Sequence, residues 1–164
     1  MSLRRIALFV TVAAVVLALD QGSKAWARTL PVGVPRPVVA GYWDWQLAYN
    51  DGSAFSTLAG GSARILLCVI AGGAVLAIGW AASRTRPEQR LKRVAYAALA
   101  GGALGNLLDR IREGAVTDFV RWHIHDHMWP VFNLADAALL IGVVLLVTEG
   151  FLARRPAARR TLSA

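Results

Sequence analysis

Several long apolar runs, separated by short clusters of charged residues, are the feature that most constrains the fold of this chain. A helix needs roughly 20 apolar residues to cross the hydrocarbon core of a membrane. A soluble domain of 164 residues would not carry several runs of that kind. We therefore expect an all-α membrane protein that forms a single domain over residues 1–164. Its four transmembrane helices are expected at about residues 5–27, 64–82, 93–109 and 134–153.

The charge balance agrees with a membrane protein and not with a nucleic-acid-binding one. The formal net charge is +8, the mean hydropathy is +0.48, and 56% of the residues are hydrophobic. The Lys and Arg residues flank the apolar runs instead of lining one helical or aromatic face. We therefore expect membrane lipid, and no nucleic acid, among the partners.

The positions of the cations predict the orientation in the membrane. Of the 18 Lys and Arg residues, 11 lie before the first span, between the second and third spans, or after the fourth. With four spans these three segments share one side, and the positive-inside rule makes that side cytoplasmic. Both termini are then cytoplasmic, and eight of the ten acidic residues lie on or near the outer side.

The first apolar run follows Arg4 and Arg5 and on its own would be typical of a cleaved signal peptide, but the later spans favour a first transmembrane helix. At its far end Asp20 precedes Lys24 by four residues, the favourable order for a pair on one helical face. One interpretation is a salt bridge at the membrane surface, worth roughly a few tenths of a kcal/mol. The other is a pair that fixes the outer end of this helix beside a functional site.

Residues 29–62 form a polar segment with several Pro and Gly residues, too long for a tight connection between helices. The run from Tyr42 to Tyr49 is rich in aromatic residues and roughly alternates in polarity. This pattern favours short strands at the membrane interface, so we expect an extracytoplasmic segment with structure of its own.

The third span contains small residues and ends in a polar cluster. Gly101 and Gly105 form a G-x-x-x-G pattern, which lets a neighbouring helix backbone approach closely. Asn106 and Arg110 follow, four residues apart, with Asp109 beside their face. Cations near a helix C-terminus compensate its dipole, which explains Arg110 but leaves Asn106 unexplained.

Asp136 lies at the start of the fourth apolar run. An ionised Asp near the centre of a membrane helix costs roughly 2.5–3.5 kcal/mol, so it is retained where it is shallow, partnered or functional. Asn133, three residues earlier, can share its helical face and orient its carboxyl group. Asp118, just before a short loop rich in His and Trp, is the candidate second carboxyl.

Two carboxyls held close together cannot both ionise cheaply and tend to share one proton, which supplies an acid and a base at one pH. Such a pair can hydrolyse a peptide bond without a nucleophilic side chain. The ionised carboxyl takes a proton from the attacking water, and the neutral one donates a hydrogen bond to the scissile carbonyl oxygen. We hypothesise that Asp118 and Asp136 are this pair and meet at the outer membrane boundary.

A competing interpretation concerns His123, His125, Asp126 and His127, whose composition is close to that of a metal site. A zinc or copper ion would need one or two further ligands, and Cys68, the only cysteine, lies inside an apolar run. The G-x-S-x-G and H-E-x-x-H patterns of other hydrolases are absent from the sequence. We therefore expect no metal and no cofactor.

Five sequence blocks follow one another along nearly the whole chain. They are LDQGSK at 19–24, YNDGSAF at 49–55, GGALGNLLDR at 101–110, VTDF at 116–119 and FNLAD at 132–136. In this order the chain resembles the bacterial lipoprotein signal peptidases, also called signal peptidase II. The resemblance implies an aspartyl endopeptidase of the inner membrane with a small extracytoplasmic β-cradle, placed here within residues 29–62. Such an enzyme removes signal peptides from prolipoproteins, cutting just before a Cys that carries diacylglycerol.

The same resemblance implies roles for individual residues. Asp118 and Asp136 would be catalytic. Substrate binding would fall to Asn50, Asn106, Arg110 and Asn133, with Asp20, Lys24 and Gly102 as supporting residues near the pocket. The substrates would be diacylated prolipoproteins, and the enzyme would act as a monomer with its active site facing the periplasm.

Two other classes of protein remain as alternatives. A small membrane transporter or ion-binding protein could use Asp20, Asp118 and Asp136 as relay or coordination sites. Four short helices without an internal inverted repeat leave little room for alternating access, and these acids lie near one face of the membrane instead of the midplane. A non-catalytic scaffold could use the small-residue helices to bind partners.

Overall fold

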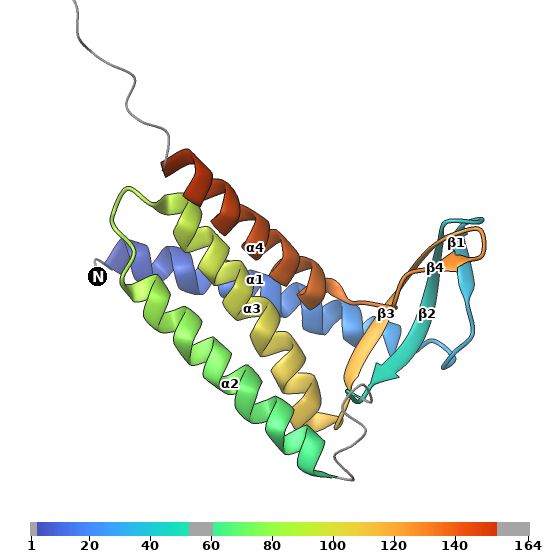
Figure 1. Ribbon diagram of the computed structural model, residues 1–164. Coiled ribbons are helices and arrows are strands. Elements are labelled where there is room, and N and C mark those ends of the chain that lie inside the picture. The colour runs from blue at the N-terminus through green and yellow to red at the C-terminus, as the bar shows by residue number, and fades with distance from the viewer. Residues whose placement is uncertain (1–2, 53–60, 154–164) are drawn as a thin grey trace, which may run out of the picture.

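The computed structural model describes residues 3–52 and 61–153. Residues 53–60 of the expected extracytoplasmic segment, and the cations of the C-terminal tail, lie outside the described residues. The described elements are α1 (Leu3–Ala27), β1 (Arg36–Val39), β2 (Trp43–Asn50), α2 (Gly61–Ser83), α3 (Arg90–Arg112), β3 (Val116–Ile124), β4 (His127–Met128) and α4 (Leu134–Ala153). The helices form an elongated bundle, and the strands form a small antiparallel sheet at one end of it (Figure 1).

Three of the described helices are long and apolar enough to cross a membrane, namely α1, α2 over residues 64–83, and α4 over residues 134–152. The helix α3 does not meet the same measure of composition, because its ends are charged and its middle is rich in Ala and Gly. It is nevertheless the central helix of the bundle, since it packs against α1, α2 and α4. The structure thus contains three candidate spans arranged around a fourth, less apolar helix.

Small residues let α3 approach its neighbours closely, as the G-x-x-x-G pattern predicted. A Cβ atom on Gly101 would lie 2.7 Å from the main-chain oxygen of Ala13 in α1. A Cβ atom on Gly102 would lie 2.7 Å from the main-chain oxygen of Ala135 in α4. Neither distance is compatible with a side chain, so the spacing of three helices depends on these two glycines.

The sheet has the strand order β1-β2-β3-β4, with all neighbours antiparallel. Placing the β-cradle within residues 29–62 was therefore incomplete, because β3 and β4 come from a stretch that we interpreted largely as a loop. The strand β3, with the sequence VTDFVRWHI, pairs with β2 from Trp43 opposite Trp122 to Asn50 opposite Val116. Its β-branched and aromatic residues suit a strand, and the His residues obscured that pattern.

An aromatic cluster joins the end of α1 to the sheet. The ring centroid of Trp26 lies 5.1 Å from that of Trp45 in β2 and 6.1 Å from that of Phe119 in β3. The Trp45 and Phe119 rings are 5.8 Å apart. Such contacts contribute about 0.5–1.5 kcal/mol each beyond simple burial, so the sheet is held in a defined position against the bundle.

A short main-chain bridge brings the start of α4 beside β3. Phe132 donates its N–H to the Val120 oxygen at 3.0 Å, and its own oxygen accepts the N–H groups of Phe119 and Val120 at 3.0 and 2.8 Å. The chain therefore runs antiparallel to β3 immediately before α4 begins. These hydrogen bonds bring Asp118 and Asp136, which are 18 residues apart in the sequence, to the same end of the bundle.

Candidate active site

Asn133 and Asp136 form a reciprocal cap at the start of α4. The Asn133 Oδ1 atom accepts the main-chain N–H of Asp136 at 3.0 Å, and Asp136 Oδ2 accepts the main-chain N–H of Asn133 at 3.1 Å. This is the capping-box arrangement, in which the residue before the helix and the third helical residue satisfy each other's N–H groups. The Asp136 carboxyl is thus fixed by local helix geometry.

The side-chain amide of Asn133 links this cap to the second carboxyl. Its Nδ2 atom donates to Asp118 Oδ1 at 2.6 Å and to Asn106 Oδ1 at 3.2 Å. The Nδ2 atom of Asn106 in turn donates to Asp136 Oδ1 at 2.8 Å. The structure therefore brings both carboxyl groups and two of the predicted Asn residues into one hydrogen-bonded cluster, as Asp118, Asn133, Asn106 and Asp136.

Lys24 joins this cluster to two further acidic residues. Its ammonium group donates to Asn106 Oδ1 at 2.8 Å and pairs with Asp20 Oδ2 at 3.0 Å and Asp109 Oδ2 at 3.3 Å. The side chains of Lys24 and Asp20 are fully buried, and that of Asp109 is 1% exposed. The interpretation of Asp20 and Lys24 as a weak surface salt bridge is therefore wrong, because both side chains are buried. Removing one partner of a buried ion pair costs about 3–5 kcal/mol.

Asp20 also contributes to the start of α4. Its Oδ1 atom accepts the main-chain N–H of Ala135 at 2.9 Å, one of the N–H groups that a helix leaves without an internal partner. Gly105 leaves room for the Asp20 carboxylate, which a Cβ atom there would overlap. The carboxylate of Asp20 thus ties α1 and α4 together on either side of α3.

Asp109 belongs to the same cluster, whereas its sequence position alone indicated only that it lies beside the face of Asn106 and Arg110. Its Oδ2 atom accepts the main-chain N–H of Thr117 at 2.9 Å, and its Oδ1 atom accepts from Arg28 Nη2 at 3.0 Å and Gln21 Nε2 at 3.1 Å. Thr117 directly precedes Asp118, so Asp109 fixes the main chain next to a candidate catalytic residue. The available signal was its position three residues after Asn106, at the same polar helix end.

The environment of Asp118 changes its acidity. Its side chain is 3% exposed, and burial raises its pKa from 3.8 to about 6, with a further contribution from the negative charge of Asp136. Hydrogen bonds from Asn133 and Asn50, and the positive charge of Lys24, act in the opposite direction. Asp118 therefore binds a proton roughly a hundredfold more tightly than an ordinary Asp, consistent with a proton shared by the pair.

The two other predicted substrate-binding residues lie at the edge of this cluster. Asn50, at the end of β2, hydrogen-bonds Asp118 and accepts the main-chain N–H of Gly52 at 3.1 Å. Arg110 is half-buried; its Nη1 atom donates to the main-chain oxygen of Asn106 at 3.4 Å. Its Nε atom is buried without a partner among the described residues, which leaves one donor free for a ligand.

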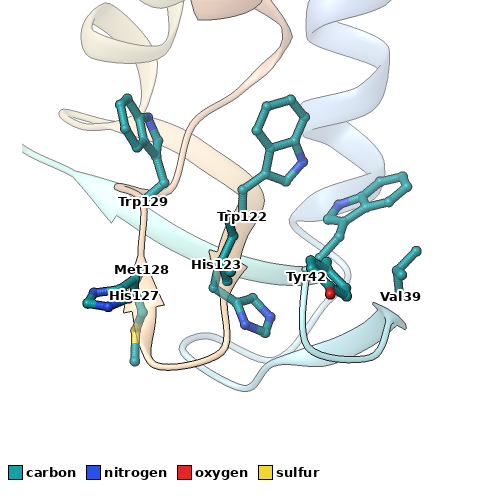
Figure 2. Close-up of a pocket in the computed structure, with 9 residues that line it drawn as sticks. Val39, Tyr42, Trp122, His123, His127, Met128 and Trp129 are labelled. Atoms are coloured by element: carbon teal, nitrogen blue, oxygen red, sulfur yellow. The ribbon is translucent and has the colours of Figure 1, made fainter.

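A separate pocket of about 540 Å³ lies on the sheet (Figure 2). Its lining includes Tyr42, Trp122, His123 and Trp129, and neither Asp118 nor Asp136 lines it. His123 Nε2 lies 3.1 Å from a carboxylate oxygen of Asp44.

Over the described ranges 3–52 and 61–153, no group of three or more His, Cys, Asp or Glu residues is placed to hold a metal ion. The His-rich stretch is instead the hairpin between β3 and β4.

The chain is similar to known proteins over most of its length. The family model of signal peptidase (SPase) II matches residues 12–152. A lipoprotein signal peptidase of Xanthomonas campestris pv. campestris (strain 8004) is 41% identical over 146 residues, 87% of each chain. One of Xylella fastidiosa (strain 9a5c) is 42% identical over 132 residues, 79% of each chain.

Solved structures of similar fold also match the chain. Two chains, each described as a bacterial membrane enzyme, superpose with TM-scores of 0.79 and 0.81 at 26% and 28% identity. The first comparison covers 97% of this chain and 96% of the other, and the second covers 92% and 95%. The resemblance seen in the five sequence blocks is confirmed, and the chain belongs to the signal peptidase II family of aspartic peptidases.

Proposed function

We propose that this protein is an aspartyl endopeptidase of the bacterial inner membrane that removes signal peptides from diacylglyceryl-modified prolipoproteins, cutting before the lipidated Cys. Its relatives are named lipoprotein signal peptidases, which disfavours the transporter and ion-binding alternative. The observation that carries the proposal is the placement of Asp118 and Asp136 on either side of the single residue Asn133.

The surroundings of the two carboxyls support different roles for them. Asp136 lies in the first turn of α4, where the helix dipole favours an anion, and accepts two hydrogen bonds. Asp118, whose pKa is about 6, is the better holder of the shared proton. In the proposed reaction Asp136 takes a proton from water as the water oxygen attacks the scissile carbonyl carbon. Asp118 donates a hydrogen bond to the carbonyl oxygen, and a proton then passes to the departing amide nitrogen as the C–N bond breaks.

The remaining site residues are assigned to binding and support. We assign Asn50, Asn106, Arg110 and Asn133 to holding the substrate main chain and orienting the two carboxyls. The unpartnered Nε atom of Arg110 supports this assignment, because a substrate carbonyl oxygen would satisfy it. We assign Asp20, Lys24 and Gly102 to supporting the pocket, because they fix α1, α3 and α4 around it. No cofactor or metal takes part in this scheme.

We further propose that α3 is a fourth transmembrane helix and that residues 1–164 form one membrane domain. Its central position among three candidate spans supports this, because an α3 outside the membrane would draw its neighbours out with it. Four spans then place both termini in the cytoplasm and the carboxyl pair on the periplasmic side. Trp122 and Trp129, which are 56% and 69% exposed on the sheet, suit the membrane–water interface at that side. The proposed working unit is a monomer in contact with membrane lipid.

The decisive experiment measures cleavage of a purified diacylated prolipoprotein and locates the cut. The wild-type protein is expected to release the signal peptide with the lipidated Cys as the new N-terminus. Asp118→Asn and Asp136→Asn are expected to lose at least about a hundredfold of the rate, the smallest typical contribution of a general acid or base. Asp126→Asn makes the same chemical change at an exposed position of the β3–β4 hairpin and is the matched control. Substantial cleavage by either active-site variant, or none by the wild type, would contradict the assignment.

A further inference from the structure

Another pocket lies at the end of the bundle away from the sheet, where a short connection joins α2 to α3. Each helix contributes one aromatic residue and one cation, spaced four residues apart. In α2 and the residue after it these are Trp80 and Arg84, and in α3 they are Lys92 and Tyr96. All four line a pocket of about 240 Å³ between the two helices, which pack against each other.

The two cations of this pocket carry no ion pair among the described residues. The guanidinium carbon of Arg84 lies 5.2 Å from the ring centroid of Trp80, which orients the side chain along the helix. Glu88 is exposed in the turn and does not line the pocket. Glu149 accepts a hydrogen bond from Gln89 at 3.2 Å and does not line the pocket. The pocket is therefore positively charged.

The connection between the helices is held in place by its own hydrogen bonds. Thr85 is buried, and its Oγ1 atom donates to the Ala82 oxygen at 2.7 Å. Gln89 Oε1 accepts the main-chain N–H of Arg86 at 2.9 Å. Both Thr85 and Gln89 also line the pocket. Since this turn is already ordered, a ligand between the helices would meet a preformed site at little cost in conformational entropy.

The order of the residues matches the layers of a membrane surface. Four residues of helix span about 6 Å. In both helices the aromatic residue lies deeper in the bundle than the cation, because α2 runs toward the connection and α3 runs away from it (Figure 1). Trp and Tyr favour the level of the lipid ester groups, whereas Lys and Arg extend to the phosphates.

From this arrangement we propose that the α2–α3 end of the bundle is a binding site for one anionic phospholipid. Arg84 and Lys92 bind the phosphate, Trp80 and Tyr96 flank the glycerol ester region, and the acyl chains follow the outer surfaces of the two helices. A net anionic headgroup is favoured over a zwitterionic one because two cations face the pocket and no acid lines it. This inference rests on the proposed insertion of α3 in the membrane but not on the peptidase chemistry.

Lipid binding to the full-length protein in mild detergent tests the inference, with native mass spectrometry counting the bound lipids. The probes are phosphatidylglycerol, phosphatidylcholine and inorganic phosphate. One variant, Arg84→Gln with Lys92→Gln, removes both pocket cations. Its matched control, Arg86→Gln with Arg90→Gln, removes two exposed cations from the same end of the bundle that do not line the pocket. Cleavage of prolipoprotein by both variants shows that each is folded, and it reports separately on the proposed function.

We expect the wild-type protein to bind one phosphatidylglycerol more tightly than phosphatidylcholine. The pocket variant should lose roughly ten- to thirtyfold in affinity for phosphatidylglycerol, whereas the control should change by less than about threefold. Equal weakening in both variants would show a general attraction to positive charge and overturn the inference. Displacement of the lipid by millimolar inorganic phosphate, or equal affinity for both lipids, would overturn it as well.

Discussion

Replacing Asp118 by Asn should stabilise the folded protein at neutral pH while it removes activity. In the folded state the pKa of Asp118 is about 6, against an ordinary value of 3.8. The unfolded chain therefore releases this proton first, and the folded state loses stability relative to it as the pH rises from about 4 to about 6. A difference of about two pKa units corresponds to about 3 kcal/mol. Asn cannot ionise and so avoids the cost of a buried negative charge beside Asp136. Asp118→Asn should therefore be more stable than the wild type by up to about 3 kcal/mol at pH 7.

The assay compares the unfolding of the two proteins in detergent at a series of pH values. The advantage of Asp118→Asn should be full above pH 6 and should vanish below about pH 4, because both side chains are then neutral. Asn133 Nδ2 donates to Asp118 Oδ1, and an amide oxygen can accept that hydrogen bond equally well. Asp126→Asn, at an exposed position, should show no comparable dependence. A constant difference between wild type and Asp118→Asn at every pH would refute the reasoning.

Three further outcomes follow from the geometry. The kcat/KM of cleavage should fall as pH rises above about 6, since Asp118 then loses the proton that it holds in the free enzyme; a profile flat to pH 8 would contradict this role. Asp109→Ala should destabilise the protein by about 3–5 kcal/mol, measured by unfolding, because it leaves the Thr117 N–H unpaired and removes one carboxylate from a buried ammonium. Gly102→Ala should cost about 1–3 kcal/mol and reduce cleavage, because its Cβ would lie 2.7 Å from the Ala135 oxygen, whereas Gly22→Ala meets no atom within 4 Å and serves as the control.

The helices and the carboxyl pair were accessible from the sequence because each leaves a local signal. An apolar run of sufficient length is a transmembrane or core helix whatever surrounds it. An Asp at the boundary of such a run is costly to keep in a membrane, so the sequence alone indicated that Asp136 has a functional role. Asn133 was predicted to orient Asp136 by sharing its helix face. The structure shows a different route, since the main-chain N–H of Asn133 holds Asp136 and its side-chain amide holds Asp118.

The parts that the sequence did not reveal depend on contacts between distant segments. The residues of β3 form a strand because they pair with β2, which lies about 70 residues earlier in the chain. Asp109 and Arg28 meet only because α1 and α3 pack together, 81 residues apart in sequence. Each of these side chains alone has an ordinary surface explanation. The burial of Asp109, which decides between the explanations, is a property of the tertiary structure.

The direction of the hydrogen bonds explains why this cluster suits one negative charge and resists two. The ammonium of Lys24 can only donate, so it fixes the oxygen of Asn106 toward itself and the Nδ2 of Asn106 toward Asp136. The oxygen of Asn133 is already used by the α4 cap, which turns its Nδ2 toward Asp118. Both carboxyls are therefore supplied with donors and can ionise. Burial and their mutual repulsion oppose ionising the second, so below about pH 6 the site retains one proton between the two carboxyls.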